Sequence, residues 1–591
     1  MKFRPHVGNA RRHTCAAIVI AVQLSLPFPH AFAQDPAIGI NQVGYLPASQ
    51  KLATVPATAQ NDFIVEHVAS GKAAYTGKLG AAAEWKPADR RVRIADFSAL
   101  SQPGRYRLRI DGLPPSDEFV VAGDAYAPLA AAAVKAFYFN RAGTALDAAH
   151  AGRFARAAGH PDDAVLVHAS AASPARPAGT KISSPKGWYD AGDYNKYIVN
   201  SAITTWTLLA AWQDFPQAFA AQDLDIPESG TDAPDLLHEA WWNLEWMLSM
   251  QDPADGGVYH KLTTLKFAGF VMPADAHAQR YVVQKSTAAA LGFAASMAQA
   301  SRVYARYEAQ FPGVAARMLA AAKAAWAWAQ RHPQDIYRQP ADVSTGEYGD
   351  RKLDDEFAWA AAELYLATGD DAFYDEFIAR GVAPRVPSWN EVGGLAWMAL
   401  AAHRDRLTPH ADGALIEERV SGMADALVRQ WKRSAYRVAM LPADFVWGSN
   451  AVAMNQAMVL MQAYRLRGRR DYLDAAQSQL DYVLGRNPLA RSFVTGFGTR
   501  PPLHVHHRVS EADGIAEPVP GWLAGGPNPG RQDARDCAAS PYPSALPALA
   551  YIDRVCSYAS NEVAINWNAP LVYVAAALQA TQGGENPPAR N

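Results

Sequence analysis

The sequence predicts a multidomain protein in which a small all-β sandwich precedes a larger all-α domain. At 591 residues the chain is longer than one ordinary domain, and its 50% hydrophobic and 19% charged residues are typical of a packed globular protein. Short β segments occur before residue 122, and Ala-rich amphipathic stretches follow. We therefore expect domains over residues 34–122 and 123–591, after a leader over residues 1–33.

The leader has the three parts of a secretory signal peptide. Its start carries positive residues and no acidic residue, an apolar run covers residues 15–28, and Ala31, Phe32 and Ala33 form a small-x-small cleavage site. We predict cleavage after Ala33 and a secreted or periplasmic product. No later apolar run approaches the ~18 residues of a membrane span, so we expect no membrane association after cleavage.

The charge balance argues against a nucleic-acid partner. The formal net charge is −2, from 55 Lys and Arg and 57 Asp and Glu. Removal of the leader takes away four Lys and Arg and no acidic residue, so the net charge falls to about −6. No basic stripe of the kind that binds nucleic acid is present. We expect a monomer whose substrate is uncharged or only mildly charged.

The sandwich is predicted from short apolar segments separated by Gly and Pro turns. These segments cover residues 63–68, 92–94, 106–110 and 118–121. Repeated short strands with turn residues between them are typical of a small β-sandwich.

The helical domain is predicted from apolar residues at helical spacing. Representative stretches cover residues 315–330, 356–367, 395–403 and 453–466, and about a dozen such helices fit before the end of the chain. No strand pattern alternates with them, which disfavours a parallel α/β fold. A closed ring of helix pairs is the simplest packing, although periodicity alone does not distinguish it from a solenoid.

Asp190 and Asp193 form the first candidate site, in the aromatic-flanked segment Gly-Trp-Tyr-Asp-Ala-Gly-Asp-Tyr at residues 187–194. A pair of carboxylates can activate water beside a sugar. The same pattern also forms turns, helix N-caps or cation loops, so it decides nothing alone.

Two later segments gather further polar groups. Residues 551–569 contain Asp553 and Glu562 just before the last helix, where a lone Glu could equally be a cap. Residues 492–508 contain His504, His506 and His507. Their spacing and the absence of a nearby cysteine make a tetrahedral zinc site doubtful, and hydrogen bonding to sugar hydroxyls explains them equally well.

Aromatic side chains in loop-like segments are candidates for sugar contact, because flat rings stack on sugars. We assign this role to Trp188, Trp447, Trp522 and Trp567, which lie near Gly, Pro or Asn. Most other Trp residues occupy helical positions, where packing in the core is the better interpretation.

Together the three segments resemble glycoside hydrolase family 9, a cellulase family with an inverting mechanism. Residues 187–200 resemble its base motif, residues 492–508 its histidine signature and residues 551–569 its acid signature. The Asn-Gln-Val-Gly-Tyr segment at residues 41–45 resembles the immunoglobulin-like module of many bacterial members. The resemblance covers nearly the whole mature chain and implies an immunoglobulin-like sandwich followed by an (α/α)6 barrel.

The resemblance implies roles for the matching residues. Glu562 would be the general acid, Asp193 the base that activates water, and Asp190 its helper. His506, Arg508 and Asp553 match signature residues near the cleavage subsites, and we add Tyr194 to the substrate-binding candidates Trp188, Trp447 and Trp567. Inversion requires the acid and base roughly 6.5 to 9.5 Å apart. We expect a protonated Glu562 and an ionised aspartate pair, in which Asp190 shares a proton with Asp193 at low pH.

No cofactor is expected for the chemistry. Many relatives carry a Cys/His zinc cluster before the base motif, but residues 168–174 contain no cysteine, so we predict no zinc. Asp355 and Glu356 match an Asp-Glu pair that often holds structural calcium, while acids favoured at a helix N-terminus explain them equally well. Cys537 and Cys556 could form a disulfide in an oxidising compartment or remain free thiols.

We predict a secreted inverting glycoside hydrolase that cleaves β-1,4-glucosidic bonds in cellulose or related β-glucans, with endoglucanase action. Alternatives on the same scaffold are an exo-acting cellobiohydrolase and an exo-β-glucosaminidase. A non-catalytic carbohydrate-binding protein would be expected to lack one of the three carboxylates. A polysaccharide lyase would need a Tyr or Lys base and neutralisation of a uronate.

Overall fold

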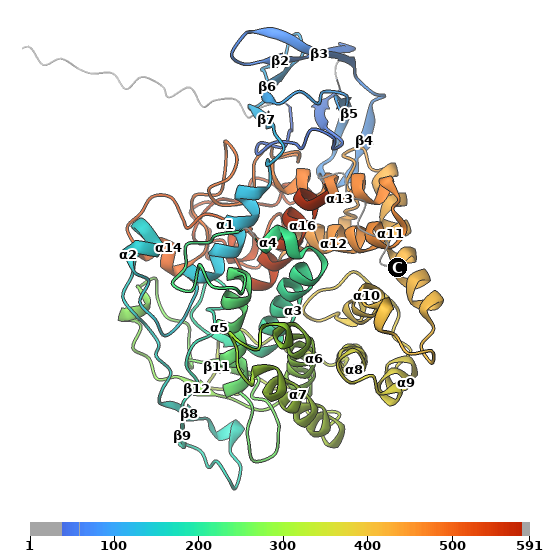
Figure 1. Cartoon of the computed structure of the whole chain (residues 1–591). Coiled ribbons are helices and arrows are strands. Elements are labelled where there is room, and N and C mark those ends of the chain that lie inside the picture. The colour runs from blue at the N-terminus through green and yellow to red at the C-terminus, as the bar shows by residue number, and fades with distance from the viewer. Residues whose placement is uncertain (1–37, 58–59, 221, 582–591) are drawn as a thin grey trace, which may run out of the picture. The chain divides into compact units, whose positions relative to one another are not determined.

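The computed structural model describes residues 38–57, 60–220 and 222–581 (Figure 1). The predicted leader over residues 1–33 lies outside these ranges. None of the helices in the described part combines the length and apolar composition needed to cross a membrane.

Two antiparallel sheets form the N-terminal sandwich, of which strands β2 to β7 are labelled in Figure 1. One sheet has the order β1-β5-β4 and the other β3-β2-β6-β7. Aromatic rings of Tyr45, Phe97 and Phe119 meet edge-on or tilted between them, with centroids 5.4 to 5.5 Å apart. The strands are β1 (Leu52–Pro56), β2 (Asp62–His67), β3 (Lys72–Lys78), β4 (Ala83–Trp85), β5 (Arg90–Asp96), β6 (Gly104–Arg109) and β7 (Phe119–Val121).

The four predicted strand segments match β2, β5, β6 and β7. The strands β1, β3 and β4 were missed. β3 is largely exposed on both faces, so its sequence lacks the apolar alternation that marks a strand. β4 has only three residues.

A closed ring of six inner helices forms the centre of the helical domain. Within the described residues, each inner helix contacts the next, and the last contacts the first. The closure decides between the ring and the solenoid that periodicity left open. The inner helices are α3 (Ile198–Asp214), α6 (Thr287–Tyr304), α8 (Asp354–Thr368), α10 (Gly393–Ala402), α12 (Ser449–Arg467) and α16 (Ile565–Ala580).

An outer layer of six helices covers the ring, so the described domain is an (α/α)6 barrel. Each outer helix contacts an inner neighbour, as α7 contacts α6 and α9 contacts α8. The outer helices are α1 (Ala127–Phe139), α5 (Asp235–Ser249), α7 (Val314–Arg331), α9 (Asp371–Ala379), α11 (Gly413–Arg433) and α13 (Arg470–Val483).

Sequence composition explains which helices lie inside. Nearly every residue of α3 and α16 is buried, as expected for helices that are apolar around their whole circumference. By contrast, α11 buries one face and exposes the other. Small residues allow the inner helices to approach closely: a Cβ on Gly292 of α6 would lie 3.1 Å from the Ala202 Cβ on α3.

A small five-stranded sheet lies in the connections and was not predicted. Its order is β10-β11-β12-β8-β9, and its strands have two or three residues, too few for a periodic pattern. The strands are β8 (Val165–Val167), β9 (Lys181–Ile182), β10 (Lys196–Tyr197), β11 (Lys261–Thr263) and β12 (Tyr281–Val282), and the short helices are α2 (Ala148–Ala151), α4 (Pro216–Ala220), α14 (Arg508–Ala512) and α15 (Tyr558–Asn561).

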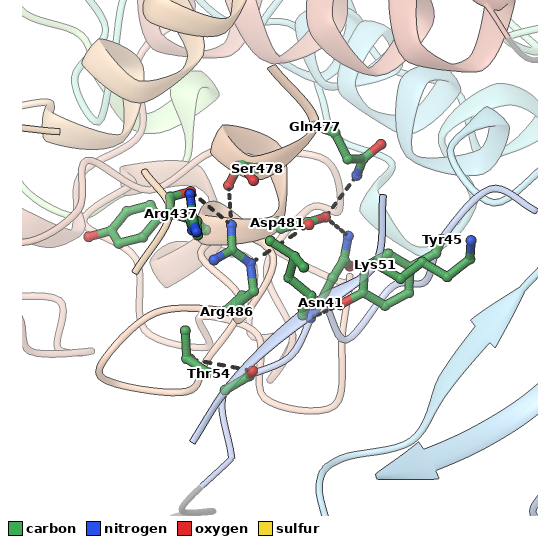
Figure 2. Close-up of polar contacts among 12 residues, drawn as sticks. Asn41, Tyr45, Lys51, Thr54, Arg437, Gln477, Ser478, Asp481 and Arg486 are labelled. Atoms are coloured by element: carbon green, nitrogen blue, oxygen red, sulfur yellow. Dashed lines mark hydrogen bonds and ion pairs between the residues drawn. The ribbon is translucent and has the colours of Figure 1, made fainter. Parts of the chain in front are cut away.

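A buried polar network joins the segment before β1 to helix α13 (Figure 2). Asp481 accepts hydrogen bonds from Asn41 Nδ2 at 2.9 Å and Gln477 Nε2 at 2.8 Å. The Arg486 guanidinium lies 3.7 Å from Asp481 and donates to the Ser478 carbonyl at 2.9 Å. Burial raises the pKa of Asp481 to about 6, although Arg486 and the two amides favour its charged form.

Cys537 and Cys556 form a disulfide with their Cα atoms 5.3 Å apart, which decides between the disulfide and the free thiols that the sequence left open. The bond closes a loop between residues 537 and 556, directly before the segment that carries Glu562. In an oxidising compartment such a bond contributes roughly 3 kcal/mol to stability.

Candidate active site

The candidate residues lie in loops that precede inner helices. Inner and outer helices alternate along the chain, so the inner helices run in the same direction and their N-termini meet at one end of the barrel. Asp190 and Asp193 precede α3, Glu562 precedes α16, and Tyr348 precedes α8. Residues far apart in sequence are thereby brought to one end of the ring.

Direct hydrogen bonds join the two carboxylate segments. The Ile565 amide, at the start of α16, donates to the Asp190 carbonyl at 2.9 Å. The Gly192 amide donates to Glu562 Oε1 at 3.3 Å across 370 residues of sequence. The structure therefore brings together Asp190, Asp193 and Glu562, as the sequence predicted.

Gly192 is required where these segments touch. A Cβ at this position would lie 2.2 Å from the His506 carbonyl oxygen, 2.9 Å from His506 Cδ2 and 3.1 Å from Glu562 Oε1. Real Cβ atoms do not come that close to backbone oxygen. The imidazole and the Glu562 carboxyl thus both lie against the Cα of residue 192.

The two aspartates have different surroundings. Both oxygens of Asp190 accept from Asn200 Nδ2, at 3.0 and 3.1 Å, and Oδ2 also accepts from the Tyr348 hydroxyl at 2.9 Å. Asp193 accepts three hydrogen bonds, from the amide and side chain of Asn195 and from the Tyr197 hydroxyl, and all three reach Oδ2. Among the described residues, none donates to Asp193 Oδ1, so this oxygen is the one available to a water molecule.

Burial raises the pKa of Glu562 well above its ordinary value, and the charges of Asp193 and Asp190 add to the effect. Arg508 acts in the opposite direction and does not reverse it. The carboxyl therefore keeps its proton at a pH where an exposed Glu has lost it, which is the state that a general acid needs.

The protonation of Asp190 differs from the sequence expectation of an ionised pair. Its burial, followed by the nearby charge of Asp193, raises the pKa of Asp190 well above the ordinary value. The hydrogen bonds from Asn200 and Tyr348 lower this pKa but do not return it to the ordinary value. Two close buried carboxylates hold one proton between them more readily than none.

His506 is neutral and has a defined tautomer. Burial lowers the pKa of its ring, and Nδ1 lies 2.6 Å from the Val555 carbonyl, to which it must donate. The neutral ring then presents Nε2 as an acceptor. The His506 amide also donates to the Asn561 carbonyl at 2.9 Å, which places the ring beside Glu562.

Asp553 and Arg508 hold the loops together. Asp553 accepts from the amides of Leu503 and His504 and from Arg491, and its pKa stays below the ordinary value despite the opposing effect of burial. Arg508 is buried and donates to the Gly192 carbonyl at 2.7 Å. Both residues therefore act at this end of the barrel by positioning the segments that carry Glu562 and His506.

Comparison with known proteins identifies the family. The profile described as Glycosyl hydrolase family 9 matches residues 126–575, and the one described as Cellulase N-terminal ig-like domain matches residues 33–114. The chain belongs to glycosyl hydrolase family 9. Its family 9 domain is the (α/α)6 barrel, and the sandwich is the immunoglobulin-like domain.

Several characterised family 9 proteins are similar over most of their length. The chain is 45% identical to the xyloglucan-specific endo-beta-1,4-glucanase of Bacteroides ovatus, over 92% of this chain and 94% of that protein. It is 33% identical to Endoglucanase D of Acetivibrio thermocellus, over 93% and 82% of the two chains. A solved family 9 structure from Bacteroides ovatus aligns with a TM-score of 0.84 and 43% identity, covering 92% of this chain and 99% of that one.

Three of the predicted aromatic contacts are wrong. Trp188 and Trp522 are fully buried in the family 9 domain, and the Trp188 indole donates to Glu239 at 2.6 Å. Tyr194 is also buried, and its hydroxyl donates to the Val271 carbonyl at 2.6 Å. A Gly or Pro neighbour does not distinguish a ring at the surface from one that packs beneath a loop.

Trp447 and Trp567 remain candidates for sugar contact. Trp447 is 42% exposed, and its ring lies 5.4 Å from that of Tyr558, which in turn lies 5.8 Å from His506. Trp567 is half-buried and packs against Gly448 and Gly525.

Asp355 and Glu356 lie in the first turn of helix α8 and are both buried. Asp355 Oδ2 accepts from the Val392 amide at 2.8 Å, whereas no residue in the described ranges is a hydrogen-bond partner of the buried oxygens Glu356 Oε2 and Asp350 Oδ2. Burial, together with Asp355 and Asp350, raises the pKa of Glu356 well above its ordinary value. In the described part of the chain, no group of three or more His, Cys, Asp or Glu side chains is close enough to hold a metal by itself.

Several residues around the carboxylates were not assigned roles from the sequence. Three of them, Asn195, Tyr197 and Asn200, lie within ten positions of the aspartates. Their place in the same short motif could have identified them as neighbours of the aspartates. Tyr348 lies 158 positions from Asp190 in an ordinary-looking loop. Only the fold brings it to the site.

Proposed function

We propose that this family 9 enzyme is an endo-β-1,4-glucanase that hydrolyses its substrate with inversion at the anomeric carbon. The observation that carries the proposal is the contact of Glu562, whose pKa burial raises, with the segment that holds Asp190 and Asp193. A protonated acid together with an ionisable carboxylate is the pair that inverting hydrolysis needs. The endo-acting β-1,4-glucanases among its relatives support the substrate class.

In the proposed reaction, Glu562 gives its proton to the glycosidic oxygen as the bond between that oxygen and the anomeric carbon breaks. A water molecule held at Asp193 Oδ1 attacks the opposite face of the same carbon. Its proton passes to Asp193, so the products are two hydroxyl-bearing sugars with an inverted anomeric centre. Proton exchange with solvent then returns Glu562 and Asp193 to their starting states.

Asp190 supports the base in this scheme. With its proton retained, Asp190 can donate a hydrogen bond that orients the attacking water, while Asp193 accepts the proton of that water. Asn200 and Tyr348 fix the Asp190 side chain from two directions. We assign Asp190 to orienting the water and Asp193 to removing its proton.

The preferred glucan is a finer part of the proposal. Similarity to a xyloglucan-specific relative favours a β-1,4-glucan that bears branches, whereas the relative named Endoglucanase D favours no particular glucan. A cellobiohydrolase or a glucosaminidase on the same scaffold would differ in where and what it cuts.

Product analysis tests the substrate and the mode of action together. The purified enzyme is incubated with xyloglucan, carboxymethyl cellulose and chitosan oligomers, and the products are sized at early times. Endo action predicts a rapid fall in polymer length with a spread of oligosaccharide products. Release of cellobiose alone would replace the proposal with exo action, and cleavage of chitosan oligomers alone would replace the glucan.

We also propose that a calcium ion binds at the start of α8. The unpartnered oxygens of Glu356 and Asp350 are hard anionic ligands that suit calcium, and carbonyl oxygens or water would complete its coordination. The cation would stabilise the loop before α8 without taking part in the chemistry. Export of a monomeric enzyme, directed by residues 1–33, is likewise part of the proposal.

A further inference from the structure

Three exposed apolar side chains occur within five residues between β11 and the 3₁₀ turn Pro273–Asp275. Phe267, Phe270 and Val271 are 46%, 42% and 38% exposed. Isolated exposed apolar residues are ordinary, but adjacent exposed rings mark a contact surface. We call residues 264–272 the Phe loop.

Hydrogen bonds attach the backbone of the Phe loop to segments of the candidate active site. Arg508 donates to the Ala268 carbonyl at 2.8 Å and, with the same guanidinium, to the Gly192 carbonyl at 2.7 Å. The Tyr194 hydroxyl donates to the Val271 carbonyl at 2.6 Å. Two residues of the catalytic segments therefore fix the backbone of the loop.

The anchoring decides which side chains face outward. Ala268 and Met272 pack against the buried cluster formed by Tyr189, Tyr194 and Val509. Phe267 and Phe270 do not belong to this cluster, and each ring centroid lies 5.4 Å from the Arg508 guanidinium. Both rings thus remain exposed because the neighbouring positions, and not the rings, fill the core.

Phe270 also contacts the group that lies beside the acid. Its ring meets the His506 imidazole edge-on, with the ring centroids 5.3 Å apart. The backbones of His506 and Glu562 form an isolated β-bridge. A ligand held on the Phe270 ring would therefore lie next to the glycosidic oxygen that receives the proton of Glu562.

We propose that Phe267 and Phe270 form a platform for the apolar face of a pyranose ring of the glucan, adjacent to the cleaved bond. The inference rests on the proposed glucanase function. Aromatic rings supply the flat apolar surface that the C–H face of a sugar covers, while Arg508 and His506 border it with polar groups. A protein partner is the weaker occupant, because two half-exposed rings fall far short of the roughly 800 Å² per side of a stable interface.

The sugar on the platform has two possible sources with the same chemistry. It is a glucose of the main chain or a xylose branch, since both are pyranoses with an apolar face. A main-chain glucose makes the platform matter for every glucan, whereas a branch makes it matter only for xyloglucan.

The test compares the double variant Phe267→Leu/Phe270→Leu with the wild type. Leucine keeps an apolar side chain against Arg508 but removes the flat ring. We expect kcat/KM to fall about tenfold, mainly through a higher KM, because each stacking contact is worth roughly a three- to tenfold change. Cello-oligosaccharides and xyloglucan oligosaccharides are assayed in parallel, and a loss on both or on xyloglucan alone identifies the main-chain or the branch source.

Controls separate this inference from folding effects and from the proposed function. The replacement Phe270→Trp keeps a ring and should retain kcat/KM, and Ile378→Ala, at an equally exposed site on α9, should leave it unchanged. A wild-type kcat/KM in the double variant on both substrates would overturn the platform. So would a loss in kcat alone, because it would indicate displaced catalytic groups. Wild-type enzyme that cleaves no glucan would instead overturn the proposed function.

Discussion

Glu562 shows how one residue takes its chemical role from burial. The residue is half-buried shortly before α16, and its pKa is raised by desolvation first and by neighbouring aspartates second. A carboxyl with a raised pKa contributes stability that is complete at low pH and is lost as pH rises through that pKa. The same shift that suits Glu562 for proton donation therefore lowers the stability of the fold in alkaline solution.

The variant Glu562→Gln separates these two effects. The neutral amide donates no proton to a leaving group, so kcat on an unactivated glucan should fall by about three orders of magnitude. Because the amide carries no charge at any pH, the variant should melt at a higher temperature than the wild type at pH 8 and at a similar temperature at pH 4. Steady-state kinetics and thermal scans at both pH values measure this. Near wild-type turnover would remove Glu562 from the role of acid.

Gly192 makes a second prediction at the residue scale. Its missing side chain allows the segment of Asp193 to touch His506 and Glu562, so Gly192→Ala should displace one of them. A shift of about 1 Å at the reacting groups costs roughly a hundredfold in kcat. The matched control is Gly422→Ala in α11, where a Cβ meets no atom within 4 Å and the helix should become slightly more stable. Equal activity in both variants would show that the close contact has no function.

The start of α8 is the element that the proposed calcium ion would stabilise. The buried carboxylates of Asp355 and Glu356 lie in the first turn of this inner helix, and one oxygen of Glu356 has no hydrogen-bond partner among the described residues. A cation there would hold α8 in the ring beside α6 and α10.

Calcium should therefore raise the melting temperature, and a chelator should lower it, by several degrees. The variant Glu356→Gln should abolish the dependence on calcium without removing the glucanase reaction at low temperature. Glu363, on the same helix but paired with Arg302, provides no free oxygen, so Glu363→Gln should leave the calcium dependence in place. A wild-type melting curve that is identical with calcium and with chelator would remove the proposed site.

At the scale of the whole molecule, the sandwich contacts the segment that carries the histidine signature. Gln42 Oε1 accepts from the amides of Thr499 and Arg500, both at 3.1 Å, and its Nε2 donates to the Ala490 carbonyl at 2.9 Å. These three positions flank the loop that leads to His506. The sandwich therefore supports the conformation of the loop that leads to His506.

Gln42→Ala should lower kcat about tenfold while the barrel remains folded, since the loop loses two acceptor contacts of about 1 kcal/mol each. Far-ultraviolet circular dichroism checks the fold, and Lys78→Ala, at an exposed ion pair of the same sandwich, is the control. An unchanged kcat for Gln42→Ala would show that the sandwich contributes stability alone.

Local patterns predicted the two-domain fold and the three carboxylates, because strand alternation, helical spacing and short motifs are properties of neighbouring residues. Local patterns could not predict contacts between residues on different helices of the ring. Tyr348 reaches Asp190 only because α8 and α3 belong to one closed ring, and Trp188 is buried by α5, which supplies Glu239. The protonation of Asp190 likewise depends on complete burial, which sequence spacing does not reveal.

The anomeric form of the first product tests the central claim most directly. Proton NMR of a β-1,4-glucan or its oligosaccharides, recorded within minutes of adding enzyme, reports this form before mutarotation. Our account, with Glu562 as acid and Asp193 as base, predicts that the α-anomer appears first. Initial formation of the β-anomer would show retention and would contradict the assignment of both residues.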